Sequence, residues 1–164
     1  MTKPTLKSLT VGASATFAAL AFFAVPALPH HSFAMYDQAK TETLTGAMKQ
    51  FVGQANHAEL HFLLIAPDRK GYAKDENGKN IEWGVELAGA AAVAKQGITA
   101  EAFPVGTVFS VKLNPLRDGG HYGSKVGAIA VCPMDPATKK PKLPEAGKHC
   151  DSVPGMTVIS GTAF

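Results

Sequence analysis

Apolar and polar positions alternate in short segments from residue 41 onward, and turns rich in glycine, asparagine and proline separate these segments. The clearest alternation runs over 56–66, where one face carries Ala58, Leu60, Phe62 and Leu64 and the other His57, Glu59 and His61. Side chains two apart on a strand share a face, so this segment is predicted to be a half-buried strand. The same reasoning predicts strands at 41–52, 80–87, 105–114 and 125–131, and a short sixth strand at 156–160.

One helix is expected within this series of strands. Residues 90–96 are alanine-rich and Gly97 follows as a helix C-terminal residue, while Thr99 could cap a further turn that Pro104 ends. Three strands, a helix and two strands are the order of the five-stranded OB barrel, with the helix between strands three and four. We therefore expect a mainly β, OB-like barrel of five to six strands. A small sandwich fits the pattern almost as well.

The expected barrel makes specific predictions about its core and its bends. Six apolar residues should be buried: Leu60, Phe62, Val85, Val108, Val111 and Ile129. Gly46 suits a bend within a long first strand. Asn77-Gly78 predicts a tight turn before the third strand.

The first 27 residues have the features of a secretory signal. Lys3 and Lys7 precede an apolar run from Leu9 to Val25, and Val25-Pro26-Ala27 places small residues where a signal peptidase cleaves. The alternative is an uncleaved anchor, although Pro26 would break a helix there. We expect cleavage after Ala27, a periplasmic or secreted product with no membrane span, and a single domain at 28–164 that begins with an arm at 28–40.

The charge balance argues against a nucleic-acid partner. Removing Lys3 and Lys7 from the 16 basic residues leaves 14 against 13 acidic ones, so the mature chain is nearly neutral. Counterion release from a nucleic acid needs several clustered cations. Adjacent basic residues occur in the mature chain only as the pairs Arg69-Lys70 and Lys139-Lys140, so no such cluster is present.

Two cysteines, Cys132 and Cys150, enclose a proline-rich segment without apolar periodicity. An isolated pair in an oxidising compartment usually forms a disulfide, so we expect a stapled loop at 132–150. Closing a loop of this size should stabilise the fold by about 3 kcal/mol. A metal-binding or redox dithiol is the alternative, but the pair lacks C-x-x-C spacing.

Histidines are the main chemical signal. His57, Glu59 and His61 share one strand face, and adjacent side chains of such a face lie about 6.5–7 Å apart. His30 and His31 are adjacent in the arm. Imidazole and carboxylate together suit Zn or Cu(II), so these five residues are the predicted metal ligands. The alternative is a solvated polar face.

No catalytic residue is predicted. Ser32 follows two histidines, but the chain has no G-x-S-x-G elbow. Glu82 and Glu86 would share a strand face, as many solvated pairs do. The Arg117–Gly120 turn lacks a P-loop lysine and is expected to be a plain hairpin turn.

Several short motifs resemble a known family. They are His30-His31-Ser32-Phe33, Tyr36-Asp37, Leu44-Thr45-Gly46, His57-Ala58, Glu82-Trp83, Gly97 and the turn Asn114–Gly120. Together they resemble a family of small exported bacterial proteins known as domain of unknown function 6152, over about 30–131. The resemblance implies a periplasmic or secreted β-rich domain and brings no established activity.

The chain also departs from that family. Glu59 follows Asn56-His57-Ala58 where family members usually have an aromatic residue, and the 132–150 loop looks like an added element. In the family the paired histidines lie near the cleavage site, where a terminal histidine would form a copper-chelating brace. Cleavage after Ala27 would instead leave Leu28 first, which favours a site made of side chains alone.

Three functions remain compatible with the sequence. The leading one is a non-enzymatic periplasmic binding domain for a small ligand or metal ion, Cu or Zn. The second is a metal-dependent enzyme or redox accessory that uses His30, His31, His57 and His61. The third is a structural or interaction module of the envelope. The sequence leaves the metal or ligand and the oligomeric state open.

Overall fold

A computed structural model describes residues 34–159 of the chain. Within this range six strands, a short α-helix and a 3-10 turn follow one another. They are β1 (Glu42–Gly53), β2 (Ala58–Leu64), β3 (Glu82–Glu86), α2 (Ala90–Ala94), β4 (Val108–Pro115), β5 (Tyr122–Val131), the 3-10 turn η1 (Cys150–Ser152) and β6 (Thr157–Ile159). The predicted signal segment at 1–27, its cleavage site, and His30 and His31 all lie outside the described residues.

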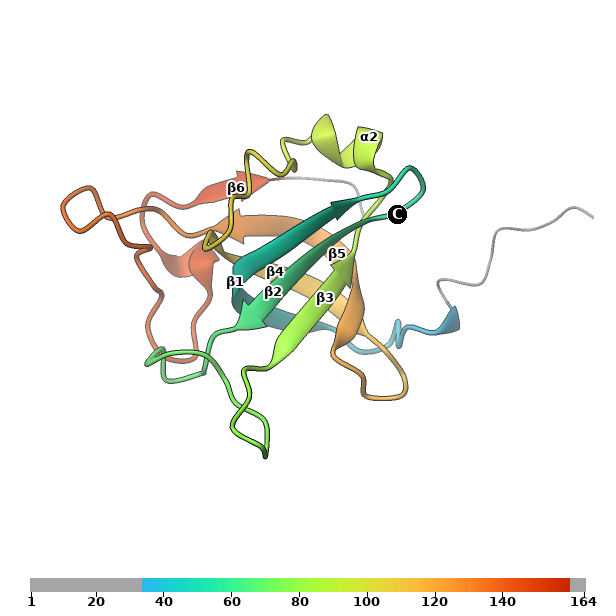
Figure 1. Ribbon diagram of the computed structural model, residues 1–164, viewed down its shortest axis with the longest axis horizontal. Helices are drawn as coiled ribbons and strands as arrows, with labels where there is room; N and C mark the ends of the chain where they lie inside the picture. The colour runs from blue at the N-terminus through green and yellow to red at the C-terminus, as the bar shows by residue number, and fades with distance from the viewer. Residues whose placement is uncertain (1–33, 160–164) are drawn as a thin grey trace, which may run out of the picture. The chain divides into compact units, whose positions relative to one another are not determined.

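The first five strands close into a barrel (Figure 1). Antiparallel pairing joins β3 to β2, β2 to β1, β1 to β4 and β4 to β5, and a parallel pairing of β3 with β5 closes the ring. The short β6 adds to the free edge of β5. This connectivity, with the helix between β3 and β4, is that of an OB-like barrel. The predicted barrel is confirmed, and the alternative of a sandwich is wrong.

Side chains of alternate strand positions fill the barrel. All six residues predicted to be buried are at most 5% exposed. The rings of Phe62 and Phe109 meet edge to face at 5.2 Å, and Phe103 meets Phe109 in the same way at 5.8 Å. Such pairs stabilise a core beyond the area that they bury.

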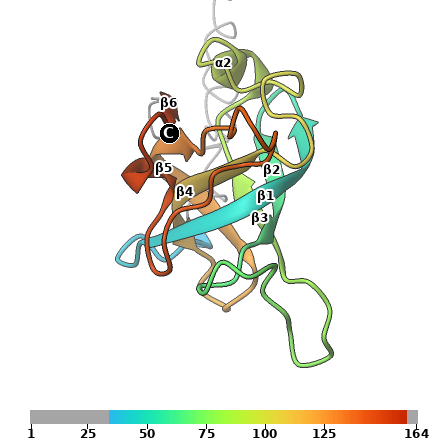
Figure 2. The ribbon, with the colours of Figure 1, turned by 90° about the vertical axis from the view of Figure 1, so that its left-hand side faces the viewer.

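The helix covers one end of the barrel, and the loop that follows β2 projects from the other (Figure 2). Val93, Ile98 and Phe103 are buried in the main core. Gly97 ends the helical segment with a φ of 83°, which lets the Ile98 N–H reach the Val93 carbonyl oxygen at 3.0 Å. The sequence predicted this ending correctly, although the helix itself stops at Ala94 rather than at 96.

Gly46 has a packing role that the sequence did not suggest. The pairing register with β2 shifts between Met48 and Gln50, so the irregularity of β1 lies a few residues further on. A Cβ at Gly46 would overlap the Phe62 ring and lie 2.9 Å from the Leu63 carbonyl oxygen. Glycine is needed here because a core aromatic ring lies against the backbone, a close approach that sequence alone does not show.

Strand β5 begins at Tyr122, three residues earlier than predicted. Gly123 pairs with Pro115 and Ser124 with Asn114, so the ladder extends through a segment whose glycine content had suggested a turn. A Cβ at Gly123 would lie 2.6 Å from Leu113 Cδ1, so this glycine also permits close packing.

The disulfide between Cys132 and Cys150 is present, as predicted. It closes the 132–150 loop over a second apolar cluster that includes Ala47, Ile65 and Val108. Hydrogen bonds fasten the end of the loop to the barrel: Ser110 Oγ accepts the Cys150 N–H at 2.8 Å, and Thr45 Oγ1 lies 2.8 Å from His149 Nδ1. No helix within 34–159 is long and apolar enough to cross a membrane.

Candidate functional site

The outer faces of β2 and β3 carry a set of charged and polar side chains. Because side chains alternate along a strand, burying Leu60 and Val85 turns Glu59, His61 and Glu86 away from the core. Glu59 and Glu86 are cross-strand partners. Like charges directly opposite one another destabilise a sheet, so this pair needs compensation from its neighbours.

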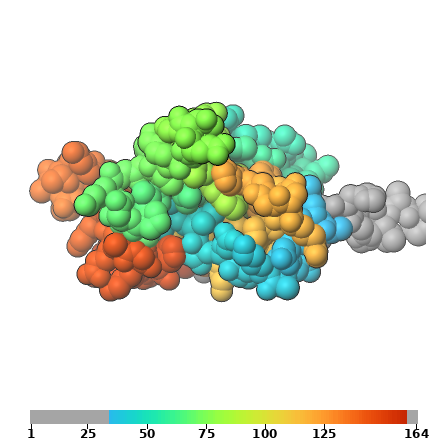
Figure 3. Space-filling view, turned by 90° about the horizontal axis from the view of Figure 1, so that it is seen from below, coloured from blue at the N-terminus to red at the C-terminus, as the bar shows by residue number. Residues whose placement is uncertain are grey.

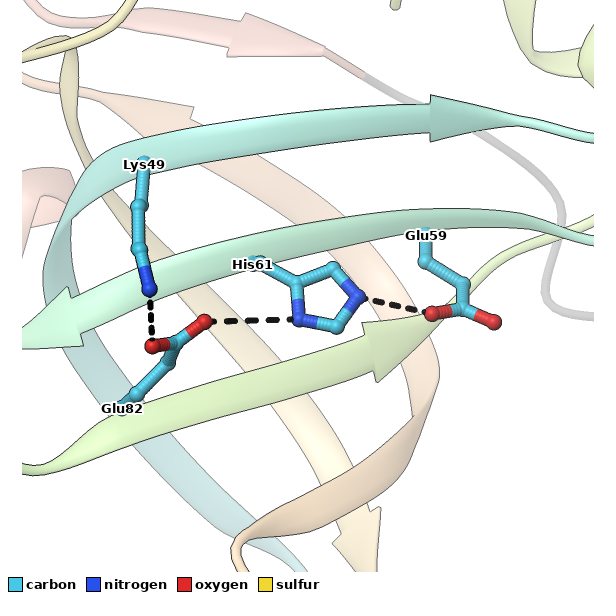
Figure 4. A network of polar contacts seen from close by, with 4 residues as sticks. All are labelled: Lys49, Glu59, His61 and Glu82. Carbon is cyan, nitrogen blue, oxygen red and sulfur yellow. Dashed lines mark hydrogen bonds and ion pairs between the residues drawn. The ribbon is translucent and has the colours of Figure 1, made fainter.

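His61 lies between two carboxylates (Figure 4). Its Nε2 is 2.8 Å from Glu59 Oε2, and its Nδ1 is 3.7 Å from Glu82 Oε1. The other oxygen of Glu82 accepts a hydrogen bond from the Lys49 ammonium of β1. Three neighbouring strands thus contribute to one chain of polar contacts, with both nitrogens of a half-buried imidazole directed at carboxylates.

Glu86 is the buried member of the face, with 7% of the residue exposed. A buried carboxylate is costly unless other groups satisfy it. Here the Tyr36 hydroxyl donates a hydrogen bond to one oxygen, and His57 Nδ1 lies 2.7 Å from the other. A residue of the amino-terminal arm and a residue just before β2 therefore meet on one side chain of β3.

Two tyrosines lie against the carboxylates. The rings of Tyr36 and Tyr122 stack with their centroids 6.4 Å apart, and a Cβ at Gly84 would overlap the Tyr122 ring. Burial raises the pKa of the Tyr36 hydroxyl above its usual range, and its hydrogen bond to Glu86 and the charge of that carboxylate raise it further. Burial, followed by the charges of Glu59 and Glu86, raises the pKa of Tyr122 as well. Both hydroxyls therefore stay protonated near neutral pH.

The arm is held in place by the turn after β4. The Asp37 N–H donates to the Pro115 carbonyl oxygen at 2.8 Å, and the Arg117 N–H to the Met35 carbonyl oxygen at 3.0 Å. Arg117 Nε also donates to the Ala34 carbonyl oxygen at 3.2 Å. The sequence predicted only a plain hairpin turn at Arg117–Gly120, whereas the structure shows that this turn also binds the arm.

The structure places the described members of the predicted ligand set on one side of the barrel. Within 34–159, however, no three histidine, cysteine, aspartate or glutamate residues are arranged to hold a single metal ion. His57 and His61 instead contact different carboxylates, Glu86 and Glu59. His121 stacks on the Trp83 ring at 5.3 Å.

The sequence did not reveal the role of three residues at this site. Tyr36 stood out only as part of a motif and Glu86 only as one of a carboxylate pair, while Tyr122 carried no signal. The missing information is the parallel pairing of β3 with β5, which places Tyr122 opposite Gly84, and the hydrogen bonding of the arm. One signal for this site was available in the sequence. The family motifs include Tyr36, His57 and the turn Asn114–Gly120, and these segments meet here.

These features define a small OB-like barrel with a histidine- and carboxylate-bearing outer face that a tyrosine of the arm partly covers. The model of the family of unknown function DUF6152 matches residues 18–125, and the chain belongs to that family. Neither the curated proteins nor the solved structures provide a match to the chain. The 132–150 loop lies beyond the matched residues.

Proposed function

We propose that this protein is an exported, non-enzymatic binding domain whose outer face on β2 and β3 binds a divalent cation, Cu(II) or Zn(II). The observation that carries the proposal is the cross-strand pair Glu59 and Glu86, each with an imidazole within 2.8 Å. Two imidazoles and two carboxylates on neighbouring strands are a nitrogen and oxygen donor set of the kind that both metals accept.

The pairing of each histidine with a glutamate supports this assignment. Histidines that bind metal usually direct their second ring nitrogen at a carboxylate, which fixes the ring and raises its basicity. His57 Nδ1 against Glu86 has this form. In the proposed complex His57 supplies a nitrogen ligand while Glu86 orients its ring. Because no three such side chains of residues 34–159 already surround one point, His61 becomes a ligand by exchanging its contact with Glu59 or Glu82 for the metal.

A third nitrogen ligand is proposed to come from His30 or His31. Tyr36 is fixed on Glu86, and His31 precedes it by five residues. An extended chain spans about 3.3–3.6 Å per residue, so His31 lies at most about 18 Å from the Tyr36 backbone. That reach includes the neighbourhood of Glu86, whose own contacts already join Tyr36 to His57.

Metal titration tests the binding site. The mature protein should bind Zn(II) or Cu(II) in calorimetric titrations, and the His57→Ala/His61→Ala variant should bind at least about tenfold more weakly. His121→Ala is the matched control, because His121 stacks on Trp83 and should leave the affinity unchanged. Acidification should weaken binding because a protonated imidazole cannot be a ligand. Equal, weak binding by the wild type and the double variant would refute the site.

A His30→Ala/His31→Ala variant tests the contribution of the arm. Its affinity for the metal should fall. Its free energy of unfolding should stay that of the wild type, which would show that the contact between Tyr36 and Glu86 is intact. Unchanged affinity would restrict the site to the barrel.

Export is tested separately by intact-mass analysis of periplasmic material. A chain that begins at Leu28 is expected, because Val25-Pro26-Ala27 fits the cleavage rule. A full-length, membrane-retained chain would contradict export with cleavage. A chain that begins at His30 would replace the side-chain site with a terminal histidine brace.

A further inference from the structure

A concave site lies away from the histidine face and shares none of its residues. It is a cavity of about 330 Å³, near the lower end of the range of about 300–1,000 Å³ that small-molecule pockets occupy. Its lining includes Ala47, Ile65, Tyr72, Val108, Lys140 and Leu143. Figures 1 and 3 show the two segments that form its walls, the loop after β2 and the 132–150 loop, side by side.

Backbone hydrogen bonds hold each wall. The Ala66 N–H donates to the Gly71 carbonyl oxygen at 2.9 Å, and the Gly106 N–H to that of Met48 at 2.8 Å. In the 132–150 loop, the Asp135 N–H donates to the Lys140 carbonyl oxygen at 2.8 Å and the disulfide fixes both ends. A pocket built this way is preformed, so a ligand does not have to order it.

The two walls are also joined to each other. The Gly147 N–H donates to the Pro67 carbonyl oxygen at 3.3 Å, and the Arg69 guanidinium donates to the carbonyl oxygen of Lys148. The spacing between the walls is therefore fixed. Tyr72 and Leu143 remain 40% and 38% exposed, so apolar area at the mouth of the cavity is available to a ligand.

One charged group defines which ligand would fit. Lys140 lies in the lining of an otherwise apolar cavity and forms no ion pair with the acidic side chains of residues 34–159. The 132–150 loop contains four lysines, at 139, 140, 142 and 148, but only two acidic residues. One of the acidic residues, Glu145, forms an ion pair with Lys148 at 2.7 Å. The Lys140 ammonium and the net positive charge of the loop favour an anion as the ligand.

We infer that this cavity binds a small organic anion with an apolar body, a medium-chain carboxylate, with the chain against Ile65, Val108 and Leu143 and the carboxylate at the Lys140 ammonium. Apolar lining supplies affinity and a single polar group fixes the orientation of the ligand. The 132–150 loop supplies Lys140 and Leu143 and lies beyond the residues that match the family model. The site is thus an addition to the barrel of this chain.

Calorimetric titration with octanoate tests the site, with EDTA present so that no cation on the histidine face contributes. Octanoate should bind more tightly than octanol. Lys140→Gln should weaken octanoate binding up to about fivefold, because it removes an exposed ion pair between the carboxylate and the ammonium. It should leave octanol binding unchanged. Lys139→Gln is the matched control, because this neighbouring lysine does not line the cavity.

The apolar wall has its own variant. Leu143→Ala should weaken the binding of both ligands about tenfold because it removes contact area. Val158 is an exposed apolar residue of β6, and Val158→Ala should change neither affinity. Methyl resonances of Ala47, Ile65 and Val108 should shift on addition of octanoate.

Three results would overturn the inference: no binding of octanoate, binding that neither Lys140→Gln nor Leu143→Ala affects, or methyl shifts confined to other residues. An anionic lysophospholipid that displaces octanoate and binds far more tightly would overturn the assignment to a free carboxylate in favour of a lipid. None of these outcomes depends on the cation site.

Discussion

The hydroxyl of Tyr36 donates a hydrogen bond to the carboxylate of Glu86, fifty residues further along the chain. Tyr36 is 1% exposed and Glu86 7% exposed, so the contact that joins the amino-terminal arm to the outer face of β3 is buried. A buried charge of this kind depends on its partners. The contact therefore helps the turn after β4 to hold the arm, and it shapes the candidate cation site.

Tyr36→Phe should lower the free energy of unfolding by about 1.5–3 kcal/mol, because it removes a hydrogen bond to a buried charged group. Urea unfolding at neutral pH measures the change. Tyr72→Phe is the control, since that tyrosine is 40% exposed and its change should stay within about 0.5 kcal/mol. Equal effects of the two substitutions would show that the Glu86 contact contributes nothing to stability.

Alkaline pH should destabilise the protein through the same residue. Burial and the Glu86 contact raise the pKa of Tyr36 above its ordinary value of 10.0. Below that value both folded and unfolded chains keep the proton, so the contribution to stability is fully present. Above it the unfolded chain releases the proton first, and stability falls as pH rises. Urea midpoints between about pH 9 and about pH 11 should fall less in Tyr36→Phe than in the wild type.

Acid should destabilise the protein through His149. Burial lowers the pKa of this imidazole below 6.5, and the nearby Arg69 charge adds to the effect, while Asp151 opposes it. As pH falls through about 6.5 the unfolded chain takes up the proton before the folded one, so this contribution to stability is lost in acid. His149→Gln keeps a group that can hydrogen-bond to Thr45 but does not titrate. Its unfolding free energy should vary less between about pH 7 and about pH 5 than that of the wild type, and an identical variation would contradict the assignment.

Reduction of the Cys132–Cys150 disulfide should lower the free energy of unfolding by about 3 kcal/mol, because the reduced unfolded chain gains conformational freedom. A Cys132→Ala/Cys150→Ala variant should lose a similar amount without reductant. Thiol labelling of the denatured, non-reduced protein should detect no free cysteine, and two labelled thiols in protein purified without reductant would contradict the bond.

The sequence determined the strand series, the helix position, the core residues and the disulfide. Alternation in 56–66 indicated which face of β2 is buried, because a strand has a period of two and the choice of face follows from the apolar positions. Gly97 marked the helix end, because a left-handed conformation favours glycine. These are local properties, and neighbouring residues are sufficient to set them.

The tertiary structure alone decided how distant segments meet. Strand pairing determines that Glu59 lies opposite Glu86 and that Tyr122 lies over Gly84, and a one-dimensional pattern contains no pairing information. The same holds for the arm, whose Tyr36 becomes a buried partner of Glu86 only because the turn after β4 binds its backbone. Likewise, Lys140 and Ile65 come to line one cavity only when the stapled loop folds against the loop after β2, a contact between residues far apart in the chain.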